Sequence, residues 1–292
     1  MVMCELIYIV GSGRSGSTLL EIILGSQEDV FSCGELCQLI IEYLNGSYCA
    51  CGETLSNCNY WSNIVTNWIK KNHLTLNEIR RFAYLDYFYS HPKNLKAWFM
   101  ALISFYQTEE YKWYLALLKS LLLEIVQHTQ AKIITDSSKS PVRILNLKKI
   151  WPGKITIIHL IRSPFEIISS LKKSWTKDKK KGIQNDIPAR NPIRTAIFWI
   201  VINSMAEFVI WLTKIKCLRI KYEDLIKNPY ILSRIYPNIK LKEPFPGTHI
   251  CAGNRIRMKK NIKIIQNKPQ KCKENLIIKA LLYFFLRKYG YK

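Results

Sequence analysis

Short apolar runs alternate with helical patterns along this chain, and the alternation predicts its fold class. The runs at 6–10, 132–135, 155–160 and 217–222 are built around Ile, Val and Leu, as is typical of short buried strands. After the first three runs, apolar residues recur at helical spacing. Strands that alternate with helices predict a three-layer α/β fold, in which helices flank a central parallel sheet.

Longer helical patterns fill the middle and the end of the chain. Between residues 60 and 130, aromatic and Leu residues recur at helical spacing, which predicts several helices with Pro92 in a connection. We interpret this segment as a helical insertion in one domain that spans 1–292. It serves either as core or as a cap over a bound acceptor. A final amphipathic helix is expected at 276–288.

The longest apolar stretch, 195–212, is a candidate membrane span. It contains Asn203, Ser204 and Glu207 and follows Arg194, whereas a span needs roughly 20 mostly apolar residues. We therefore expect a buried core helix here and no transmembrane segment. Because the first predicted strand begins so early, no signal peptide fits ahead of it, which predicts a cytoplasmic protein.

The chain of 292 residues is strongly basic. It carries 44 Lys and Arg against 21 Asp and Glu, a formal net charge of +23. Such a field attracts anionic ligands, nucleic acid or anionic membranes, although heavy use of Lys, Ile and Asn also fits an AT-rich genome. The sequence has no recognition-helix, RNA-binding-sheet or zinc-finger pattern. We therefore expect no specific nucleic-acid partner, while peripheral membrane contact stays open.

The clearest chemical motif is the glycine-rich segment between the first strand and its helix. The spacing Gly11-x4-Gly16 is that of a phosphate-binding loop, in which backbone N–H groups surround an anion at a helix N-terminus. A nucleoside-triphosphate enzyme carries Lys at the next position, where this chain has Ser17. The cation lies earlier, as Arg14. The loop therefore indicates anion binding without the usual ATP or GTP chemistry.

Further polar residues follow the other predicted strands. The turn 136–139 follows the apolar run at 132–135, and Arg162 follows the run at 155–160. Both are therefore expected beside the glycine-rich loop at the carboxyl edge of the sheet, where ligands of such sheets bind. The Lys-rich segment 172–191 is either a solvated loop or a mobile lid. The turn at 249–257, with two arginines, is either a basic surface turn or a phosphate clamp.

Three of the nine cysteines, Cys49, Cys51 and Cys58, lie close together in the sequence. Candidates for the fourth ligand of a zinc ion would be Cys33, Cys37 and His73. The spacing lacks the two CxxC pairs of common zinc sites, and a disulfide or simple buried thiols remain alternatives. We expect a structural clip for a loop and assign no metal ligand.

Several of these motifs together resemble sulfotransferases that use 3′-phosphoadenosine 5′-phosphosulfate (PAPS). GSGRSGSTLL is similar to the family's 5′-phosphosulfate loop, and Arg162 with Ser170 matches the spacing of its 3′-phosphate motif. DSSKSP, KYEDL and GNRIR resemble later blocks of the bacterial-type and tyrosylprotein branches, and CACGETLSNCNYW resembles a cysteine box of bacterial members. The resemblance covers residues 5–58, 131–226 and 249–257.

The resemblance implies a P-loop-like fold and transfer of a sulfuryl group from PAPS to a hydroxyl or amine, with no metal required. It assigns the 5′-phosphosulfate to Ser12, Gly13, Arg14, Ser15, Gly16, Ser17 and Thr18. It assigns the 3′-phosphate to Arg162, Ser170 and Arg257, beside Gly253 and Asn254. Lys139 would stabilise the leaving group together with Arg14. The implied general base is Glu35, with Asp136 and Glu21 as alternatives.

Two other functions remain open at this point. A P-loop nucleotide kinase is disfavoured by Ser17, and a non-catalytic basic protein that binds anions or nucleic acid is supported only by the charge. The acceptor is not readable from the sequence, so a small molecule, a carbohydrate, a lipid and a peptide all remain candidates. The oligomeric state is equally open.

Overall fold

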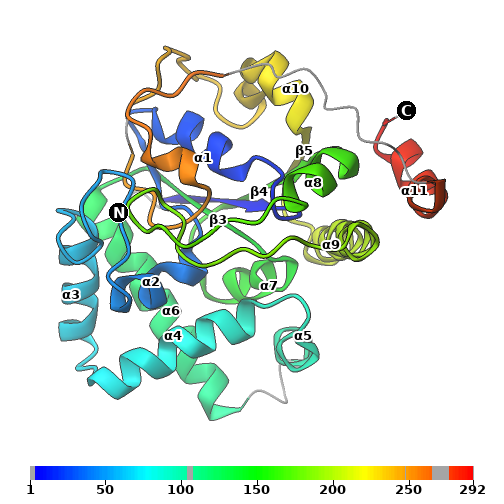
Figure 1. The fold of residues 1–292 in the computed structure, drawn as a ribbon. Helices are drawn as coiled ribbons and strands as arrows, with labels where there is room; N and C mark the ends of the chain where they lie inside the picture. Colours follow the sequence, from blue (N-terminus) through cyan, green and yellow to red (C-terminus); the bar gives the residue numbers. More distant parts are fainter. Residues whose placement is uncertain (1–3, 104–107, 247, 265–275, 292) are drawn as a thin grey trace.

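The computed structural model describes residues 4–103, 108–246, 248–264 and 276–291. Its centre is a parallel sheet with the strand order β2-β3-β1-β4-β5 (Figure 1). The strands are β1 (Glu5–Val10), β2 (Val30–Ser32), β3 (Ile133–Lys139), β4 (Ile155–Ile161) and β5 (Cys217–Lys221). The four strands predicted from the apolar runs are confirmed, and β2 is a further short strand at the edge of the sheet.

Both faces of the sheet are covered, as the central strand β1 shows. Leu6, Tyr8 and Val10 belong to one apolar cluster, whereas Ile7 and Ile9 belong to another on the opposite face. Because successive strand residues point to opposite faces, a strand buried on both sides reads as one continuous apolar run. This is the reason that the sequence predicted the three-layer α/β fold, which the structure confirms.

The helices form three groups around the sheet (Figure 1). One face carries α1 (Ser17–Gly25) and α10 (Tyr222–Lys227), which pack in the cluster of Ile7 and Ile9. The other face carries α7 (Pro141–Ile150) and the inserted helices. A third group, α8 (Pro164–Leu171), α9 (Pro192–Thr213) and α11 (Leu276–Lys288), shares its own apolar cluster, which includes Ile161 at the end of β4.

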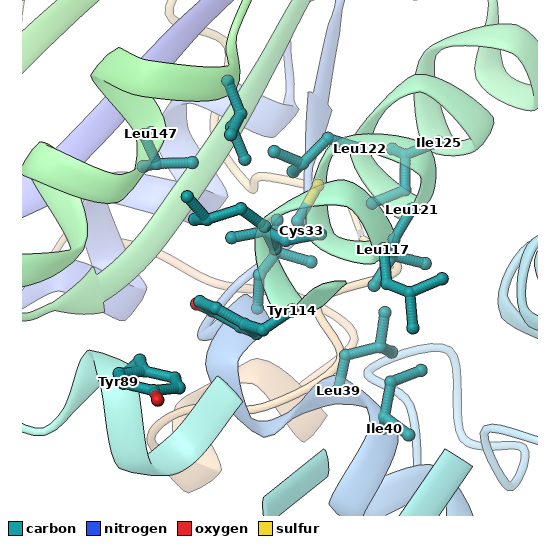
Figure 2. Close-up of a cluster of buried hydrophobic side chains, with 14 of the residues drawn as sticks. Cys33, Leu39, Ile40, Tyr89, Tyr114, Leu117, Leu121, Leu122, Ile125 and Leu147 are labelled. Atoms are coloured by element: carbon teal, nitrogen blue, oxygen red, sulfur yellow. The ribbon is translucent and has the colours of Figure 1, made fainter. Parts of the chain in front are cut away.

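The predicted helical insertion is confirmed. Within residues 60–130 it consists of α3 (Trp61–Lys71), α4 (Leu76–Ser90), α5 (Leu95–Leu102) and α6 (Glu109–Thr129), and α2 (Leu39–Leu44) precedes it. Pro92 lies between α4 and α5, as expected. Figure 2 shows how Tyr89 of α4, Leu117 and Leu121 of α6 and Leu147 of α7 meet in one core, so the insertion is packed onto the sheet layer.

A buried ionic cluster also joins the insertion to the sheet. Arg143 of α7 donates from Nε to Asp136 Oδ2 of β3 at 2.8 Å, and its Nη1 bonds Asp86 of α4. Ser90 Oγ accepts from the same Nη1 at 2.9 Å, and the Tyr114 hydroxyl donates to Asp86 at 3.0 Å. Each charge is fully or almost fully buried, so this cluster is a fixed part of the core.

Two local expectations need correction. The segment 136–139 is no turn, because β3 continues through it and Lys139 pairs with Val10 after a shift in register. Helix α9 is longer than expected and is not buried on all sides. Ile197, Val201 and Trp211 are exposed, and Trp211 is 72% exposed. Among the described helices α9 alone is long and apolar enough to cross a membrane, by length and composition, and its buried side packs against α7, α8 and α11.

Candidate active site

A cavity of about 1380 Å³ opens at the carboxyl ends of the strands. Its walls come from the glycine-rich loop 11–19, the end of β3, helix α8 with the segment 173–199, the turn 253–256 and residues 87–93 of the insertion. The predicted convergence at this edge of the sheet is therefore present. The insertion contributes to the core and also to the wall of the cavity, whereas its role as a cap over an acceptor stays a prediction.

The glycine-rich loop has a backbone that only glycine fits at two positions. A Cβ on Gly16, which has a φ of +96°, would lie 2.2 Å from the ring of Tyr222. A Cβ on Gly11 would lie 2.3 Å from the carbonyl oxygen of Leu160. No side chain caps the N-terminus of α1 at Gly16. The first N–H groups of α1, which have no acceptor within a helix, thus face the cavity with the positive end of the helix dipole.

Six of the seven loop residues predicted to bind the donor line the cavity: Ser12, Gly13, Arg14, Gly16, Ser17 and Thr18. Ser15 does not line it. Its Oγ is buried, has no hydrogen-bond partner among the described residues and lies beside Gly11. Thr18 Oγ1 accepts a hydrogen bond from the N–H of Asn254 at 3.0 Å, which attaches the predicted turn 253–254 to the loop.

Arg14 lies in a strongly positive part of the site. Burial lowers the pKa of its guanidinium, and the positive charges of Arg190 and Arg255 lower that pKa further, while Glu35 acts in the opposite direction. Its backbone is left-handed, with a φ of +68°, which is uncommon for a residue with a side chain. Three cations that repel one another in a partly dry cavity are stabilised when an anion binds between them.

Arg162 and Ser170 lie on one wall, as their spacing predicted. Arg162 follows β4, donates from Nη1 to the Arg14 carbonyl at 3.1 Å and from Nη2 to Glu166 at 3.2 Å. Its guanidinium also stacks on Tyr222, 4.5 Å from the ring centre. The Nε atom is buried without a partner in the described parts of the chain. The guanidinium is thus held firmly, and a donor is left for a ligand.

The turn near the C-terminus departs from the prediction in one respect. Gly253 and Asn254 line the cavity, but Arg257 does not. Its buried guanidinium donates to the carbonyl oxygens of Gly182 at 3.1 Å, Gly253 at 3.0 Å and Tyr48 at 3.3 Å. Its Nε is buried without a partner among the described residues, as in Arg162, but Arg257 does not line the cavity and both of its Nη atoms donate to protein carbonyls, so the structure does not place it as a phosphate ligand. It holds three loops together instead.

Glu35 and Lys139 meet at the cavity wall. Lys139 Nζ forms an ion pair with Glu35 Oε1, and the side chains are 17% and 25% exposed. Lys139 ends β3 with a φ of +67°, and Glu35 precedes the short helix η1 (Leu36–Gln38). The backbone N–H of Glu35 donates to the carbonyl of Ala252 at 3.3 Å. A carboxylate and an ammonium group are thus side by side within reach of the glycine-rich loop.

The two alternative bases lie elsewhere. Glu21 is fully buried in α1, where it accepts a hydrogen bond from Thr135, and burial raises its pKa to about 7. Asp136 is fully buried and paired with Arg143. Neither residue lines the cavity. Of the three carboxylates considered from the sequence, only Glu35 reaches it.

His91 is a cavity residue that the sequence analysis missed. It follows the last turn of α4, and its Nδ1 accepts the N–H of Lys93 at 3.3 Å. Burial and the charge of Lys93 lower the pKa of His91, so its imidazole is neutral at pH 7. The only signal in the sequence was a His before a Pro at the end of a helical pattern, and nothing there linked it to residues around 14 or 139.

The Lys-rich segment 172–191 forms a side wall of the cavity. Backbone hydrogen bonds join Trp175 to Ile187 and Asp178 to Ile183, so the segment folds back on itself. Trp175 lines the cavity, and the guanidinium of Arg255 stacks on its ring, 4.0 Å from the ring centre. Most lysines of the segment are solvent-exposed, as expected of a solvated loop, and the mobile lid stays a prediction.

Comparison with known proteins agrees with this architecture. The family model described as "Sulfotransferase family" matches residues 7–241. A solved structure, the sulfotransferase domain from the Synechococcus PCC 7002 olefin synthase, is similar with a TM-score of 0.50 and 16% identity. That match covers 97% of this chain and 94% of the other, and it supports the fold alone. No curated protein sequence matches. Because the family model spans most of the chain, including every wall of the cavity before residue 242, this protein belongs to the sulfotransferase family.

Proposed function

We propose that the protein transfers a sulfuryl group from PAPS to a hydroxyl or amine of an acceptor. The observation that carries this proposal is the pair of cationic positions in one cavity. One is the uncapped N-terminus of α1 with Arg14, and the other is Arg162 with its unpartnered Nε beside Ser170. PAPS has two phosphate groups at opposite ends of one nucleoside, whereas ATP has only one phosphate end.

The loop and Arg162 suit these two groups differently. Several N–H donors converge at the first turn of α1, which suits the 5′-phosphosulfate. Arg162 is fixed by Glu166 and by the ring of Tyr222, so its free Nε presents a preoriented donor to a 3′-phosphate. Such a site selects the bisphosphate nucleotide through Arg162 and binds any 5′-phosphate through Arg14.

The Glu35–Lys139 pair supplies the base and a stabilising cation of the proposed reaction. The acceptor oxygen or nitrogen attacks sulfur, the bond from sulfur to the phosphate oxygen breaks, and Glu35 takes the acceptor proton. Lys139 stabilises the negative charge that develops on the departing phosphate oxygen. The products are the sulfated acceptor and adenosine 3′,5′-bisphosphate. Because the transferred group carries a single negative charge, this scheme uses cationic side chains and no metal ion.

The acceptor would enter from the wall formed by the insertion. Tyr87, His91 and Lys93 line this side, together with Phe198 of α9. These residues offer aromatic surface with a cation and an imidazole, which suits a ring-bearing acceptor such as a sugar or a phenol. His91 is within the same cavity as Glu35, so it is the alternative base to be tested beside Glu35.

Thermal unfolding with added nucleotides tests the proposal. A ligand at 100 times its Kd stabilises the folded state by about 2.7 kcal/mol. We expect adenosine 3′,5′-bisphosphate to raise the Tm far more than ADP or ATP at equal concentration. Arg162→Ala should remove this preference, and Arg14→Ala should abolish stabilisation by all three nucleotides. Stabilisation by ATP with magnesium that equals or exceeds that by the bisphosphate would refute the proposal and favour a kinase.

A further inference from the structure

Three cysteines and a histidine gather outside the cavity. Cys49, Cys51 and Cys58 lie in the loop between α2 and α3, and His249 comes from the segment that leads into the turn 253–254. One ligand atom from each residue lies within 4.8 Å of all the others. His249 Nδ1 is 3.3 Å from Cys58 Sγ and 3.9 Å from Cys49 Sγ.

The distances of 3.3 and 3.9 Å from His249 Nδ1 to the two sulfurs are close to those of a tetrahedral site. With Zn–S near 2.3 Å and Zn–N near 2.0–2.1 Å, two sulfurs around one zinc ion are about 3.8 Å apart, and a sulfur and a nitrogen are about 3.5 Å apart. Three cysteines with one histidine are an established ligand set for structural zinc. We propose that Cys49, Cys51, Cys58 and His249 bind one structural Zn²⁺ ion.

The loop is folded so that the sulfurs face one point. The Gly52 N–H donates to the Cys49 carbonyl at 3.0 Å, and the Cys49 N–H donates to the Glu53 carbonyl at 2.8 Å, which closes a tight turn around Cys51. The Cys58 N–H donates to the Thr54 carbonyl at 2.8 Å. Backbone hydrogen bonds within the loop thus help to hold the three cysteines close together.

His249 is also held in place. Its ring packs on Tyr60, with 4.4 Å between the ring centres, and its carbonyl accepts a hydrogen bond from the indole of Trp61. Cys49 and Cys58 are buried, whereas Cys51 is exposed. A metal ion therefore has access from the side of Cys51, and the aromatic rings shield the other side.

The fourth ligand differs from those considered from the sequence. Cys33 belongs to the apolar core, Cys37 lines the cavity, and neither they nor His73 join the group. A zinc ion here would be structural and would take no part in sulfuryl transfer. The proposal therefore stands independently of the proposed function.

The ion would fasten the loop to the catalytic side of the molecule. The Ala50 N–H donates to the carbonyl of Ile250, and Tyr48 accepts from the buried Arg257. The chain after His249 contacts the candidate active site at two points. The carbonyl of Ala252 accepts a hydrogen bond from the N–H of Glu35, and the N–H of Asn254 donates to Thr18 Oγ1. Three thiolates with one neutral imidazole give a site of net charge −1 with Zn²⁺, and binding releases the thiol protons.

Metal content tests the proposal directly. The full-length protein, purified under reducing conditions without chelator, should contain about one zinc ion per chain by elemental mass spectrometry. Cys51→Ser is the most informative variant, because Cys51 is exposed and its replacement removes a ligand without disturbing the core. We expect this variant and His249→Ala to lose at least about tenfold in zinc content. The matched control Cys217→Ser, on β5, should keep its zinc.

Thermal stability distinguishes a bound metal ion from free thiols or a disulfide. Chelation should lower the Tm of the wild type to that of Cys51→Ser and should leave the variant unchanged. Replacement by Co²⁺ should give the visible absorption of tetrahedral thiolate ligation, which is lost in both variants. Two results would overturn the proposal. One is a wild-type protein that contains no zinc after incubation with Zn²⁺, and the other is an intact mass that is lower by two hydrogens because these cysteines form a disulfide.

Discussion

The buried Arg143 offers a sharp test of the energetics that join the helical insertion to the sheet. Arg143 is fully buried and is paired with Asp136 of β3 and Asp86 of α4, which are 0% and 3% exposed at their side chains. Replacing it by methionine keeps an unbranched side chain of similar length but removes the positive charge. Two buried carboxylates then lose their counter-ion.

The expected loss follows from this burial. Breaking a buried ion pair by removing one partner costs about 3–5 kcal/mol, because a charge remains without compensation in a dry environment. Burial already raises the pKa of Asp86 although Arg143 opposes the shift, so Asp86 should take up a proton in the variant. A pKa raised above its unfolded value means that stability falls as the pH rises. The destabilisation by Arg143→Met should therefore be larger at pH 8 than at pH 5.

Urea unfolding of the purified proteins measures this difference. The matched control is Arg81→Met, because Arg81 pairs with Glu110 at 2.9 Å while its side chain is 54% exposed. Such a surface pair contributes about 0–1 kcal/mol. The further change of Asp86 and Asp136 to Asn in the Arg143→Met background should recover part of the lost stability. An Arg143→Met protein no less stable than the Arg81→Met control would refute the reasoning.

Three further predictions concern the site and its support. Gly16→Ala should abolish binding of adenosine 3′,5′-bisphosphate in calorimetry, because its Cβ meets the ring of Tyr222, and the second change Tyr222→Ala should restore part of that binding. Glu35→Gln should lower kcat by about 10²- to 10⁴-fold in a sulfate-transfer assay while its affinity for the bisphosphate stays unchanged. If His91→Gln shows this loss instead and Glu35→Gln stays active, His91 is the general base and Glu35 is not. Glu21, whose pKa burial raises from its ordinary value of 4.5 to about 7, should make the wild type lose about 3 kcal/mol of stability between pH 4.5 and 7. Glu21→Gln should flatten that pH dependence in urea unfolding, and an unchanged slope would contradict the shift.

The parts of the site that the sequence predicted are those fixed by local geometry. A buried strand, a glycine-rich turn and a helix must present the N-terminus of that helix at the edge of the sheet, which places residues 11–18. Parallel strands bring their carboxyl ends to one edge, so Lys139 and Arg162 were expected near the loop without knowledge of the strand order. Ser170 lies on α8, the helix that begins two residues after Arg162, so its place is also local.

The parts that could not be predicted depend on partners distant in the sequence. Asp136 and Glu35 each come shortly after an apolar run in the sequence, yet Asp136 lies within β3 and pairs with Arg143 in the core, whereas Glu35 pairs with Lys139 at the cavity. Arg257 looked like a phosphate ligand because its neighbours are Gly, Asn and Arg, but three carbonyls from separate loops surround it. His249 lies 191 positions from Cys58, so no spacing rule connects the two.

The exposed face of α9 shows a limit of composition as a guide to burial. An even distribution of apolar residues around a helix predicts burial on every side, and α9 has such a distribution over 195–212. In the structure only one side of it meets α7, α8 and α11, and Phe208 and Trp211 lie outside that contact. In the sequence, the polar Asn203 is evidence against a membrane span. In the structure its Oδ1 is hydrogen-bonded to His159 Nε2 of β4 at 3.0 Å, so Asn203 lies on the buried side of α9.

Arg257 connects the two features on which the proposals rest. Its guanidinium reaches Tyr48, one residue before Cys49 of the proposed zinc site, and also Gly253, which lies against Thr18 in the anion-binding loop. The third carbonyl, that of Gly182, belongs to the Lys-rich wall of the cavity. Burial lowers the pKa of Arg257, and the three carbonyl oxygens offset part of the cost of keeping its charge away from water. Arg257 thus joins two segments that line the cavity to the loop of the proposed zinc site without lining the cavity itself. Its loss should weaken bisphosphate binding, while the groups that contact the nucleotide stay chemically intact.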